Sequence, residues 1–555
     1  MQLETMYPAA ANSKATTTVG ALNADTTTIT VLDGTVLPEA PNLLVLGTDQ
    51  TAETVLMTGK DGNVLTVERG FQGVAKAWNA GTEVARNFTA YDADTMKANI
   101  EGMAAEMGTI ADTMAKESSL QTFRQESKAA SDKILAYLKD KTMARYGIRI
   151  NKNEPDPAAR VEYLYEAVGM KPAKMNYVTG QFDYGDWANV WFVKENYPVM
   201  VKFNGEEDYR LDKNDMTKRV NGAASDIANS GYGGNAMSAI PLVWIARWEE
   251  GNYEYISVCQ SQYDETYRAD AHTKEDGSIM DKYYMACYRG ALVDTKLRSL
   301  SGLQPMHSKT AQQEIDYAKA NGELWDTDSY SRYNLIADLM TIMAKTEDSQ
   351  AAYGNGNLNY QEDLTPTHGV MQTGTLNDKG QFWGMNDNTH QMKAFYIEAV
   401  YADQWRRVRG LIYDHGIIKI KPTAPYNLTG EGYYSTGIHL LNASGEAQSG
   451  ENNHGWISGT KMTKYGRLPV QLGGSSATYT CDYCWSRDDI VAVGLVGADC
   501  SSYEGCGVRA AALNNMADWS NWHYGAALSS FLLLCIIVLS IPQRLLKINS
   551  TRRAA

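Results

Sequence analysis

The sequence predicts an α+β protein in which a small β-rich domain precedes a larger mixed domain. Its 555 residues suffice for two to four domains, and a hydrophobic content of 44% allows sizeable cores. Short β-branched runs near the N-terminus are broken by Gly, Asn and Asp, which is typical of small all-β domains. Farther along, strand-like runs alternate with loops around one clear helix, which indicates a helix packed on a mixed sheet.

Residues 1–91 are predicted to form the small β domain. Strand-like runs such as TTTITVLD, NLLVLGT, ETVLMTG and NVLTVERG follow one another at a spacing of about ten residues. This spacing fits a small sandwich, barrel or prism.

Residues 92–160 are predicted to form a helical connector that begins with Asp92 as its N-cap. Apolar residues then recur at spacings of 4-3-4-3-4, which is a heptad pattern. The pattern fits either a coiled coil between chains or one amphipathic helix packed on a domain, and Gly102 and Gly108 weaken the helix. A linker is expected at 117–130 and a second helical piece at 131–141. The predicted seam consists of Met96, Ile100, Met103, Met107, Ile110 and Met114.

Residues 161–530 contain no clear linker and no internal repeat, so they are expected to form one large domain. Its clearest helix is predicted from about Asp328 to Thr346. Apolar residues at helical spacing give this helix one face that should be buried, namely Tyr333, Ile336, Leu339, Met340 and Met343.

The amino-acid composition narrows the range of functions that the chain is expected to have. The chain has 51 basic and 65 acidic residues, a net charge of −14, which argues against nucleic acid as a partner. Tyrosine (34) and tryptophan (12) are abundant beside nine phenylalanines, a bias that favours recognition surfaces. The sequence contains no H-E-x-x-H, G-x-S-x-G, P-loop or dinucleotide motif, and a glycosidase pair of carboxylates stays open.

The segment 494–529 is the most informative part of the chain. Glycines punctuate it, and Leu513, Trp522 and Leu528 are expected to anchor it in a core. Small, polar and Tyr-rich residues between these points describe a binding surface better than an active site. The candidate outward-facing residues are Asp499, Ser501, Ser502, Tyr503, Ala510, Ala511, Asp518, Ser520, His523 and Tyr524.

This segment, with its pattern GVR…LNN…NWHYGAALS, resembles the variable C-terminus of phage receptor-binding proteins that retroelements diversify, the major-tropism-determinant type. The resemblance implies that the ten residues are hypervariable and bind a receptor. Six further motifs in family order, from RLDKNDMTKRVNGAASDIAN to YGRLPVQLGG, resemble the scaffold of large C-type-lectin-like domains, a fold shared with formylglycine-generating enzymes. The block from Glu53 to Phe88 is similar to N-terminal modules of phage tail-fibre and baseplate proteins.

The resemblance implies a phage tail-tip adhesin in the virion that binds a bacterial surface receptor, either protein or glycan. Other phage tail or baseplate proteins would be its partners, and the family's trimers favour a homotrimer. The N-terminus, MQLETMYPAA, has no secretory pattern, so synthesis in the host cytoplasm and release by lysis are expected. The alternatives are a formylglycine-generating-like copper oxygenase and a purely structural baseplate protein, and no catalytic residue is assigned.

The seven cysteines leave several interpretations open. Cys481-x-x-Cys484 with Cys500 and Cys506 could bind zinc, and Cys500 and Cys506 could form a disulfide or bind Cu(I). Free, partly buried thiols are the preferred prediction, with no metal or cofactor required. Oxygen ligands that are scattered along the sequence, such as Asp387, are compatible with a structural Ca²⁺ site.

Residues 531–555 depart from the family pattern. The apolar stretch from Phe531 to Ile541 is eleven residues long, whereas a transmembrane helix needs about 20. It is read as a buried closing element or a frame-shifted extension, and the basic residues that follow it also suit contact with a membrane surface.

Overall fold

The computed structural model describes residues 3–114, 124–131, 133, 143–451 and 453–530. The chain divides into two compact units, Met1–Ala136 and Tyr137–Ala555. Helices and strands are mixed, which confirms the α+β class. The tail 531–555 and most of the predicted helical piece at 131–141 lie outside the described residues. Residues 124–130, expected to be linker, are helical instead, because RQESKAA is rich in good helix formers.

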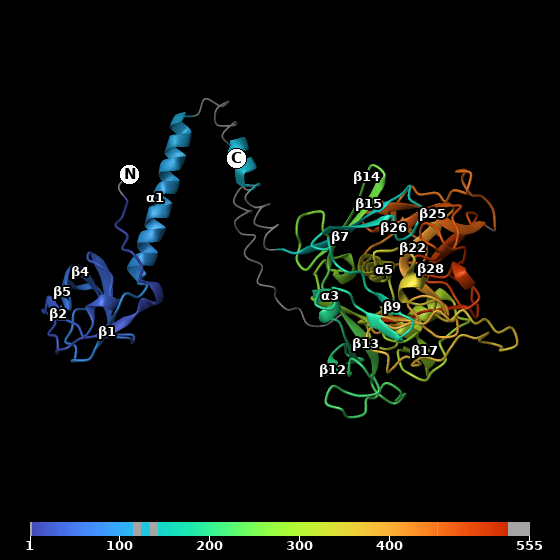
Figure 1. Cartoon of the computed structure of the whole chain (residues 1–555), viewed down its shortest axis with the longest axis horizontal. Coiled ribbons are helices and arrows are strands. Elements are labelled where there is room, and N and C mark those ends of the chain that lie inside the picture. The colour runs from blue at the N-terminus through green and yellow to red at the C-terminus, as the bar shows by residue number, and fades with distance from the viewer. Residues whose placement is uncertain (1–2, 115–123, 132, 134–142, 452, 531–555) are drawn as a thin grey trace. The chain divides into compact units, whose positions relative to one another are not determined.

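The first unit contains a six-stranded antiparallel sheet in the order β1-β6-β3-β4-β5-β2 (Figure 1). β2 to β5 overlap the predicted runs, whereas β1 lies before the first of them, and the buried residues of the sheet form one core around Ile29, Leu44, Val55 and Leu65. The strands are β1 (Ala15–Thr17), β2 (Thr28–Thr30), β3 (Asn42–Leu46), β4 (Glu53–Asp61), β5 (Val64–Gln72) and β6 (Glu83–Ala85), with short 3-10 turns at Ala11–Ser13 and Gly34–Val36.

Glu53, the first residue of the interior strand β4, organises one end of this sheet. Its buried carboxylate accepts hydrogen bonds from Nε and Nη2 of Arg69 at 2.8 and 2.7 Å, from the Gly70 amide at 2.7 Å and from Nε1 of Trp78 at 3.0 Å. Burial alone would raise the pKa of Glu53, but these donors hold it below its ordinary value. Four residues of the block singled out in the sequence therefore form one hydrogen-bonded cluster, whereas Phe88 at its end is exposed.

The helix α1 (Ala90–Met114) follows β6. It begins before Asp92, which is therefore not its N-cap. Oγ1 of Thr89 accepts a hydrogen bond from the Asp92 amide at 3.4 Å, and the Asp92 carboxylate accepts one from the Thr89 amide at 2.8 Å. This is the reciprocal arrangement of a capping box. Asp92 also pairs at 2.6 Å with Arg86, the residue that follows β6, and this pair holds the helix start beside the end of that strand.

One face of α1 is apolar and uncovered. Met96, Ile100, Met103 and Met107 are between 43% and 68% exposed. The other face contacts its own unit, where Asn99 is buried and accepts a hydrogen bond from the Glu4 amide at 2.7 Å. The side chains of Ile110 and Met114, the last two residues of the predicted seam, lie outside the described residues.

The described residues of the second unit form three larger sheets. The four-stranded sheet has the order β14-β15-β7-β8, the six-stranded sheet β12-β11-β13-β16-β31-β19, and the third β24-β23-β22-β28-β29-β27-β25-β26 with β30 beside β22. The bounds in the first sheet are β7 (Arg145–Asn151), β8 (Val161–Tyr165), β14 (Trp244–Glu250) and β15 (Tyr253–Cys259). Those in the second are β11 (Tyr197–Lys202), β12 (Glu207–Arg210), β13 (Gly234–Pro241), β16 (Lys282–Ala286), β19 (Trp325–Thr327) and β31 (Leu528–Ser530).

The third sheet contains β28, β29 and β30, three strands to which the terminal segment contributes. Its strands are β22 (Trp405–Asp414), β23 (Ile417–Ile420), β24 (Tyr434–Ser435), β25 (Asn453–Thr463), β26 (Gly466–Leu472), β27 (Tyr483–Ser486), β28 (Val491–Val496), β29 (Ala511–Leu513) and β30 (Tyr524–Gly525). Three two-stranded ribbons complete the unit: β9 (Lys174–Asn176) with β10 (Gln181–Asp183), β17 (Ala291–Val293) with β18 (Lys296–Arg298), and β20 (Lys393–Ala394) with β21 (Ile397–Glu398).

The helix α5 (Tyr330–Ala344) lies where the sequence predicts a helix, but it is buried on every side and not only on one face. It packs against β7, β22 and β26 (Figure 1). Its polar residues are therefore enclosed, and Asp338 has to be paired with arginines. The other helical pieces are α3 (Trp191–Lys194), α4 (Ala311–Lys319), α6 (Ser349–Tyr353), η3 (Asp270–His272) and η4 (Tyr503–Gly505).

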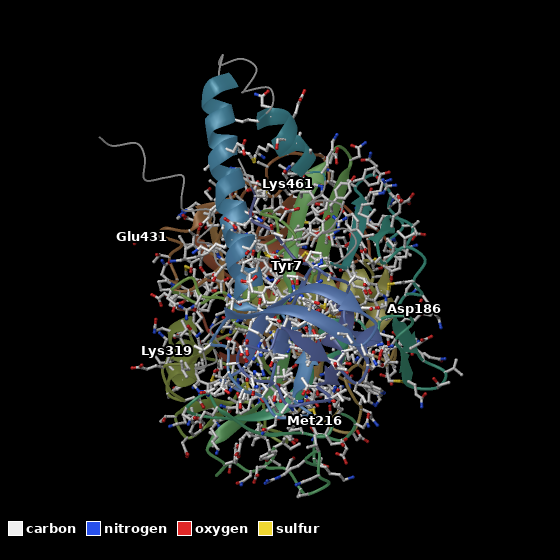
Figure 2. The ribbon with its side chains drawn as sticks, turned by 90° about the vertical axis from the view of Figure 1, so that its left-hand side faces the viewer. Tyr7, Asp186, Met216, Lys319, Glu431 and Lys461 are labelled. Carbon is white, nitrogen blue, oxygen red and sulfur yellow. The ribbon has the colours of Figure 1, made fainter. Side chains whose placement is uncertain are left out.

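The surface of the second unit is rich in charged side chains, such as Asp186, Lys319 and Glu431, whereas Met216 is buried (Figure 2). Among the helices that the structure describes, none combines the length and the apolar character needed to cross a membrane.

Candidate functional site

The terminal segment 494–529 passes through two sheets of the second unit. β28 and β29 are neighbours in the third sheet, and β30 runs parallel to β22. β31 is inserted between β16 and β19 of the six-stranded sheet. Leu513 and Leu528 are buried, as predicted. The strands fix the backbone, and the loops 497–510 and 514–523 lie between them.

The ten predicted surface residues fall into two groups. Six reach the surface of this chain, wholly or in part: Ser501, Ser502, Tyr503, Asp518, Ser520 and His523. The remaining four are buried: Asp499, Ala510, Ala511 and Tyr524. The expectation that all ten face outward is therefore wrong for these four.

The buried group has clear structural reasons. Ala511 lies in β29 opposite both Cys484 of β27 and Val496 of β28, so strands flank it on both sides. Tyr524 lies in β30, where the guanidinium of Arg407 sits 4.7 Å from the centre of its ring. These side chains are part of the sheet and not of its exposed loops.

Asp499 shapes the loop that follows β28. Its Oδ1 accepts hydrogen bonds from the Ser501 amide at 2.9 Å and from the hydroxyls of Ser501 and Ser502, each at 2.8 Å. Nδ1 of His523 lies 3.6 Å from its Oδ2. After this turn Tyr503 adopts a positive φ of 48° and its side chain is 62% exposed. A buried carboxylate thus fixes the loop that displays Tyr503.

Tyr503 borders an open hollow of about 480 Å³. We call it the aromatic hollow. One side is formed by β25 and β27, which contribute His454, Trp456, Tyr483 and Trp485. The other side is the loop 501–505 together with Asn388.

The register between β25 and β27 gathers the four ring residues. Trp485 lies opposite His454, and Tyr483 lies opposite Trp456. Because residues two apart on a strand share a face, all four side chains project to the same side. Tyr483 is central, with ring centres 4.5 Å from Trp485, 5.3 Å from Trp456 and 5.8 Å from His454. Trp405, buried, packs edge-on against Trp485 at 5.4 Å.

Sequence reasoning missed His454 and Trp456 and treated Tyr483 and Trp485 only as surroundings of Cys484. A signal was available, because both stretches alternate aromatic and non-aromatic residues with a period of two. That pattern predicts a strand with rings on one face. The pairing of two such strands is a feature of the fold, and the sequence does not reveal it.

Arg509 ties the loop 497–510 to α5. Its Nη1 donates to Oδ1 of Asn334 at 2.8 Å and its Nη2 to the buried carboxylate of Asp338. Its backbone amide donates to Asp482 at 2.6 Å. A Cβ at Gly507 would lie 1.8 Å from Oδ1 of Asp482, so only glycine permits this approach. These contacts fix the C-terminal end of the loop 497–510.

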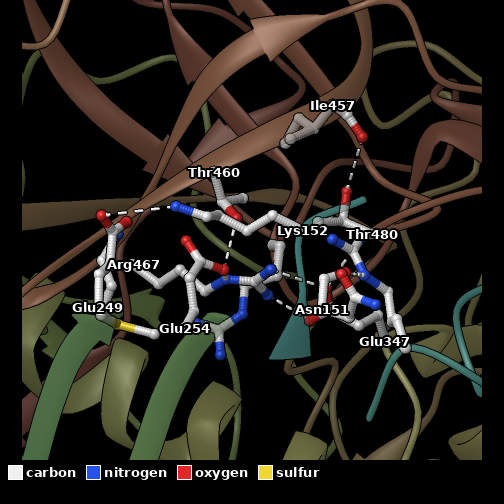
Figure 3. Close-up of polar contacts among 12 residues, drawn as sticks. Asn151, Lys152, Glu249, Glu254, Glu347, Ile457, Thr460, Arg467 and Thr480 are labelled. Atoms are coloured by element: carbon white, nitrogen blue, oxygen red, sulfur yellow. Dashed lines mark hydrogen bonds and ion pairs between the residues drawn. The ribbon is translucent and has the colours of Figure 1, made fainter. Parts of the chain in front are cut away.

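A second buried network fixes the hairpin of β25 and β26 (Figure 3). Nε of Arg467 donates to Glu254 at 2.7 Å, and Nη2 donates to Glu347 at 2.8 Å. Thr460 also donates to Glu254 at 2.8 Å, and Lys461, at the exposed side of β25 (Figure 2), pairs with Glu249 at 2.6 Å. Burial alone would raise the pKa of Glu347, but Arg467 keeps it below its ordinary value.

Trp522 was expected in a core, but it is half-buried. Its ring packs on His368 at 4.7 Å and on Tyr360 at 5.7 Å. It therefore anchors the loop 514–523 on a neighbouring loop, near the surface.

The six cysteines among the described residues are free and buried: Cys259, Cys287, Cys481, Cys484, Cys500 and Cys506. Cys500 donates to the carbonyl of His368 and Cys506 to that of Gly497, so the two thiols have different partners. Burial raises the pKa of both, which opposes the thiolate that Cu(I) or Zn²⁺ would need.

No group of three or more His, Cys, Asp or Glu side chains suited to a metal ion occurs in the described part of the chain. Asp387, considered for Ca²⁺, contacts Nδ1 of His390 at 2.8 Å. Among the described residues, the structure therefore gathers no set of metal-binding side chains around the cysteines Cys500 and Cys506 or around Asp387.

No protein-family model matches this chain, and no curated protein matches it. The candidate site combines a fixed backbone frame, exposed loop residues and an open aromatic hollow.

Proposed function

We propose that this chain is a receptor-binding protein of a phage tail, which attaches the particle to a receptor on a bacterial surface without catalysis. In this proposal residues 161–530 form a C-type-lectin-like domain and residues 494–529 are the diversified segment. The observation that carries it is the loop 499–505, which exposes Tyr503 while its backbone is held by Asp499 and, farther on, by Arg509.

Preorganisation explains why this arrangement suits binding. A loop that is already ordered loses little conformational entropy when it meets a partner, so more of the contact energy appears as affinity. Tyr503 offers a large contact area with few rotatable bonds, and the neighbouring Ser501 and Ser502 add polar contacts. Side chains at such positions can change without altering the frame.

The proposal limits variation to the six positions that reach the surface. Changes at Asp499, Ala510, Ala511 or Tyr524 would disturb packed or hydrogen-bonded groups and would be selected against. Sequencing sister particles tests this directly. Variation should concentrate at the exposed and half-buried positions, beside a reverse transcriptase gene and a near-repeat of the 3′ end. Absence of any such variation would favour the structural baseplate alternative.

A binding assay tests the function itself. Fluorescently labelled full-length chain is titrated onto a panel of bacterial isolates, and cell-bound fluorescence is measured. Tyr503→Ala should lower binding to the recognised isolates at least tenfold with unchanged thermal unfolding. Tyr434→Ala, which removes another exposed tyrosine outside the terminal segment, is the matched control and should bind normally. Equal losses in both variants, or no isolate bound, would contradict the proposal.

The first unit is proposed to attach the chain to the particle, with α1 bringing copies together. Support comes from the exposed seam residues Met96, Ile100, Met103 and Met107, whose heptad spacing matches that of another identical helix. Analytical ultracentrifugation of the full chain should give a trimer, and Met103→Lys should shift it to monomer. A monomeric parent chain would overturn this part alone.

A further inference from the structure

We propose that the aromatic hollow binds a neutral glycan, so that the receptor is a sugar chain and not a protein. The inference rests on the proposed function, because it names the class of receptor that the same surface recognises. It is carried by three features of the hollow: clustered ring faces, unpaired polar groups beside them, and a single carboxylate as its charge.

The ring faces suit the C–H face of a pyranose. An aromatic face carries partial negative charge and attracts groups with partial positive charge, such as the axial C–H bonds of a sugar ring. His454, Trp456, Tyr483 and Trp485 project from one face of two paired strands, with Tyr483 at the centre. Their ring planes differ by 27° to 80° from that of Tyr483, so they present faces in several directions.

Several polar groups beside these rings have no hydrogen-bond partner among the described residues, whereas the hydroxyls of Ser501 and Ser502 are held by Asp499. Within the described part of the chain, the indole N–H groups of Trp456 and Trp485, the side-chain amide nitrogen of Asn388 and the carboxylate of Glu504 make no hydrogen bond. The hydroxyl of Tyr503 is likewise unpaired. An apolar peptide side chain or a quaternary ammonium would cover these groups without bonding them, which costs free energy. Sugar hydroxyls can donate and accept in turn.

The charge of the hollow selects among glycans. Among the described residues that line it, Glu504 is the one acidic side chain, and there is no lysine or arginine. A sialic acid, a uronic acid or a phosphate-bearing polymer would meet like charge without a cationic partner. The whole chain, at a net charge of −14, adds to this repulsion at low ionic strength.

In this inference the two sides of the hollow contribute differently to glycan binding. The strand side is fixed by its register and by the buried pairs of Arg467, so it supplies a constant stacking surface. The loop side contains Ser501, Ser502 and Tyr503, which the proposed diversification would change. Changes there would alter which sugar is preferred without removing the stacking surface.

The test uses the full-length chain with defined probes. Isothermal titration and tryptophan fluorescence are measured with N-acetylchitotetraose, maltoheptaose, yeast mannan and laminarin as neutral glycans. Hyaluronan fragments and polygalacturonate are the anionic probes, and choline chloride is the cationic one. At least one neutral glycan should bind, and the anionic and cationic probes should not. Binding of choline alone, of an anionic probe alone, or of none of the probes would overturn the inference.

Matched variants locate the binding. Trp485→Ala should weaken the glycan that binds at least tenfold, whereas Trp248→Ala should leave it unchanged, because Trp248 is a half-buried tryptophan stacked on Tyr255 outside the hollow. Glu504→Lys changes an exposed residue and keeps the test valid if Trp485→Ala unfolds. It should let hyaluronan fragments bind where the parent chain does not. Equal losses in both tryptophan variants, or no gain in Glu504→Lys, would count against the site.

Treatment of bacterial cells separates this inference from the proposed function. Mild periodate oxidises surface sugars, whereas proteinase K removes surface proteins. If cell binding is lost after periodate and kept after proteinase, both proposals stand. If it is lost only after proteinase, the chain is an adhesin but its receptor is a protein. If the glycan binds in solution and no bacterial cell does, the inference stands and the adhesin proposal fails.

Discussion

The terminal segment holds two kinds of position that look alike in the sequence and differ in the fold. Ser501, Tyr503 and Ser520 reach the surface, whereas Asp499, Ala511 and Tyr524 are enclosed. In each group there are tyrosines and small or polar residues. For Ala511 and Tyr524 the difference arises from the strands, because β29 and β30 are inserted into a sheet, whereas Asp499 lies in a loop and is enclosed by the turn that it organises.

This difference in burial indicates which positions of the segment 494–529 can tolerate amino-acid substitutions. A buried alanine flanked by two strands has no space for a large ring, since the cavity beside Ala511 measures only about 30 Å³. A buried carboxylate with three donors has no substitute of the same shape and charge. An exposed tyrosine has neither limit. Tolerance to substitution therefore follows burial and not residue type, and stability measurements can test that rule position by position.

The largest effect is expected where the segment is anchored to α5. Asp338 is fully buried and pairs with Arg247 at 2.6 Å and with Arg509. Asp338→Asn would leave two buried guanidiniums without their carboxylate, at a cost of about 3–5 kcal/mol. Denaturant unfolding followed by tryptophan fluorescence measures this loss.

Asp518→Asn is the matched control for Asp338→Asn. Asp518 lies in the exposed loop 514–523, so the same change should alter the free energy of unfolding by less than about 0.5 kcal/mol. Similar values for the two variants would show that Arg509 does not anchor the loop.

A smaller loss is expected from overpacking the sheet. Ala511→Tyr places a large ring on the buried face of β29, where the interior is already packed, which should cost about 1–3 kcal/mol or prevent folding. Ser520→Tyr makes a comparable increase in size in an exposed loop and should leave the unfolding midpoint unchanged. If both variants were equally stable, Ala511 would belong with the surface group.

A pH effect of similar or smaller size is expected beside Tyr524. Glu314 in α4 is buried and pairs with Arg407 at 2.8 Å, whose guanidinium lies over the Tyr524 ring. Burial raises the pKa of Glu314 from 4.5 to about 7, and Arg407 only partly opposes this. The folded chain then keeps a proton that the unfolded chain releases. Stability from this group is complete below pH 4.5 and lost as the pH rises through 7.

The free energy of unfolding should therefore fall by about 1–3 kcal/mol between pH 5 and pH 8 on account of Glu314. Urea unfolding across this range measures the slope. Glu314→Gln, which has no ionisable proton, should flatten the curve. A parent chain whose stability rises over the same range would contradict the assigned direction.

The small β sheet could be predicted from sequence because its signals are local. Alternating β-branched residues and Gly or Asn turns specify β3, β4 and β5 almost to the residue. The cluster around Glu53 could not be predicted in this way, because its donors Arg69 and Trp78 meet it only through the pairing of strands.

The helix α5 shows what periodicity leaves open. Its apolar spacing predicted a helix at the right place, yet that spacing says nothing about what covers the opposite face. Asp338 and Arg332 look like surface residues in the sequence, but they lie in the centre of the unit. Their partners come from distant strands and loops, so local patterns could not have identified them.

The candidate site was only half predictable for the same reason. The loop around Tyr503 was found from composition and from the resemblance to a known family of variable proteins. The rings of His454 and Trp456 come from β25, more than forty residues earlier, and reach the loop only through the register with β27. Burial of Asp499 likewise follows from the turn that it organises.

The smallest effect on stability is expected at Ser502, on the border between the two groups of positions. Ser502→Ala removes two hydrogen bonds with Asp499 and keeps those from Ser501: the Ser502 hydroxyl donates to the Asp499 carboxylate at 2.8 Å and accepts from the Asp499 amide at 3.3 Å. Because Asp499 stays partly satisfied, the loss should be about 0.5–1.5 kcal/mol, visible as a small shift in the unfolding midpoint. Ser520→Ala, in an exposed loop, should cause no shift. Cell binding of Ser502→Ala should weaken more than its stability does, since the loop that carries Tyr503 becomes less ordered. A variant with full binding and a large loss of stability would place Ser502 with the buried scaffold.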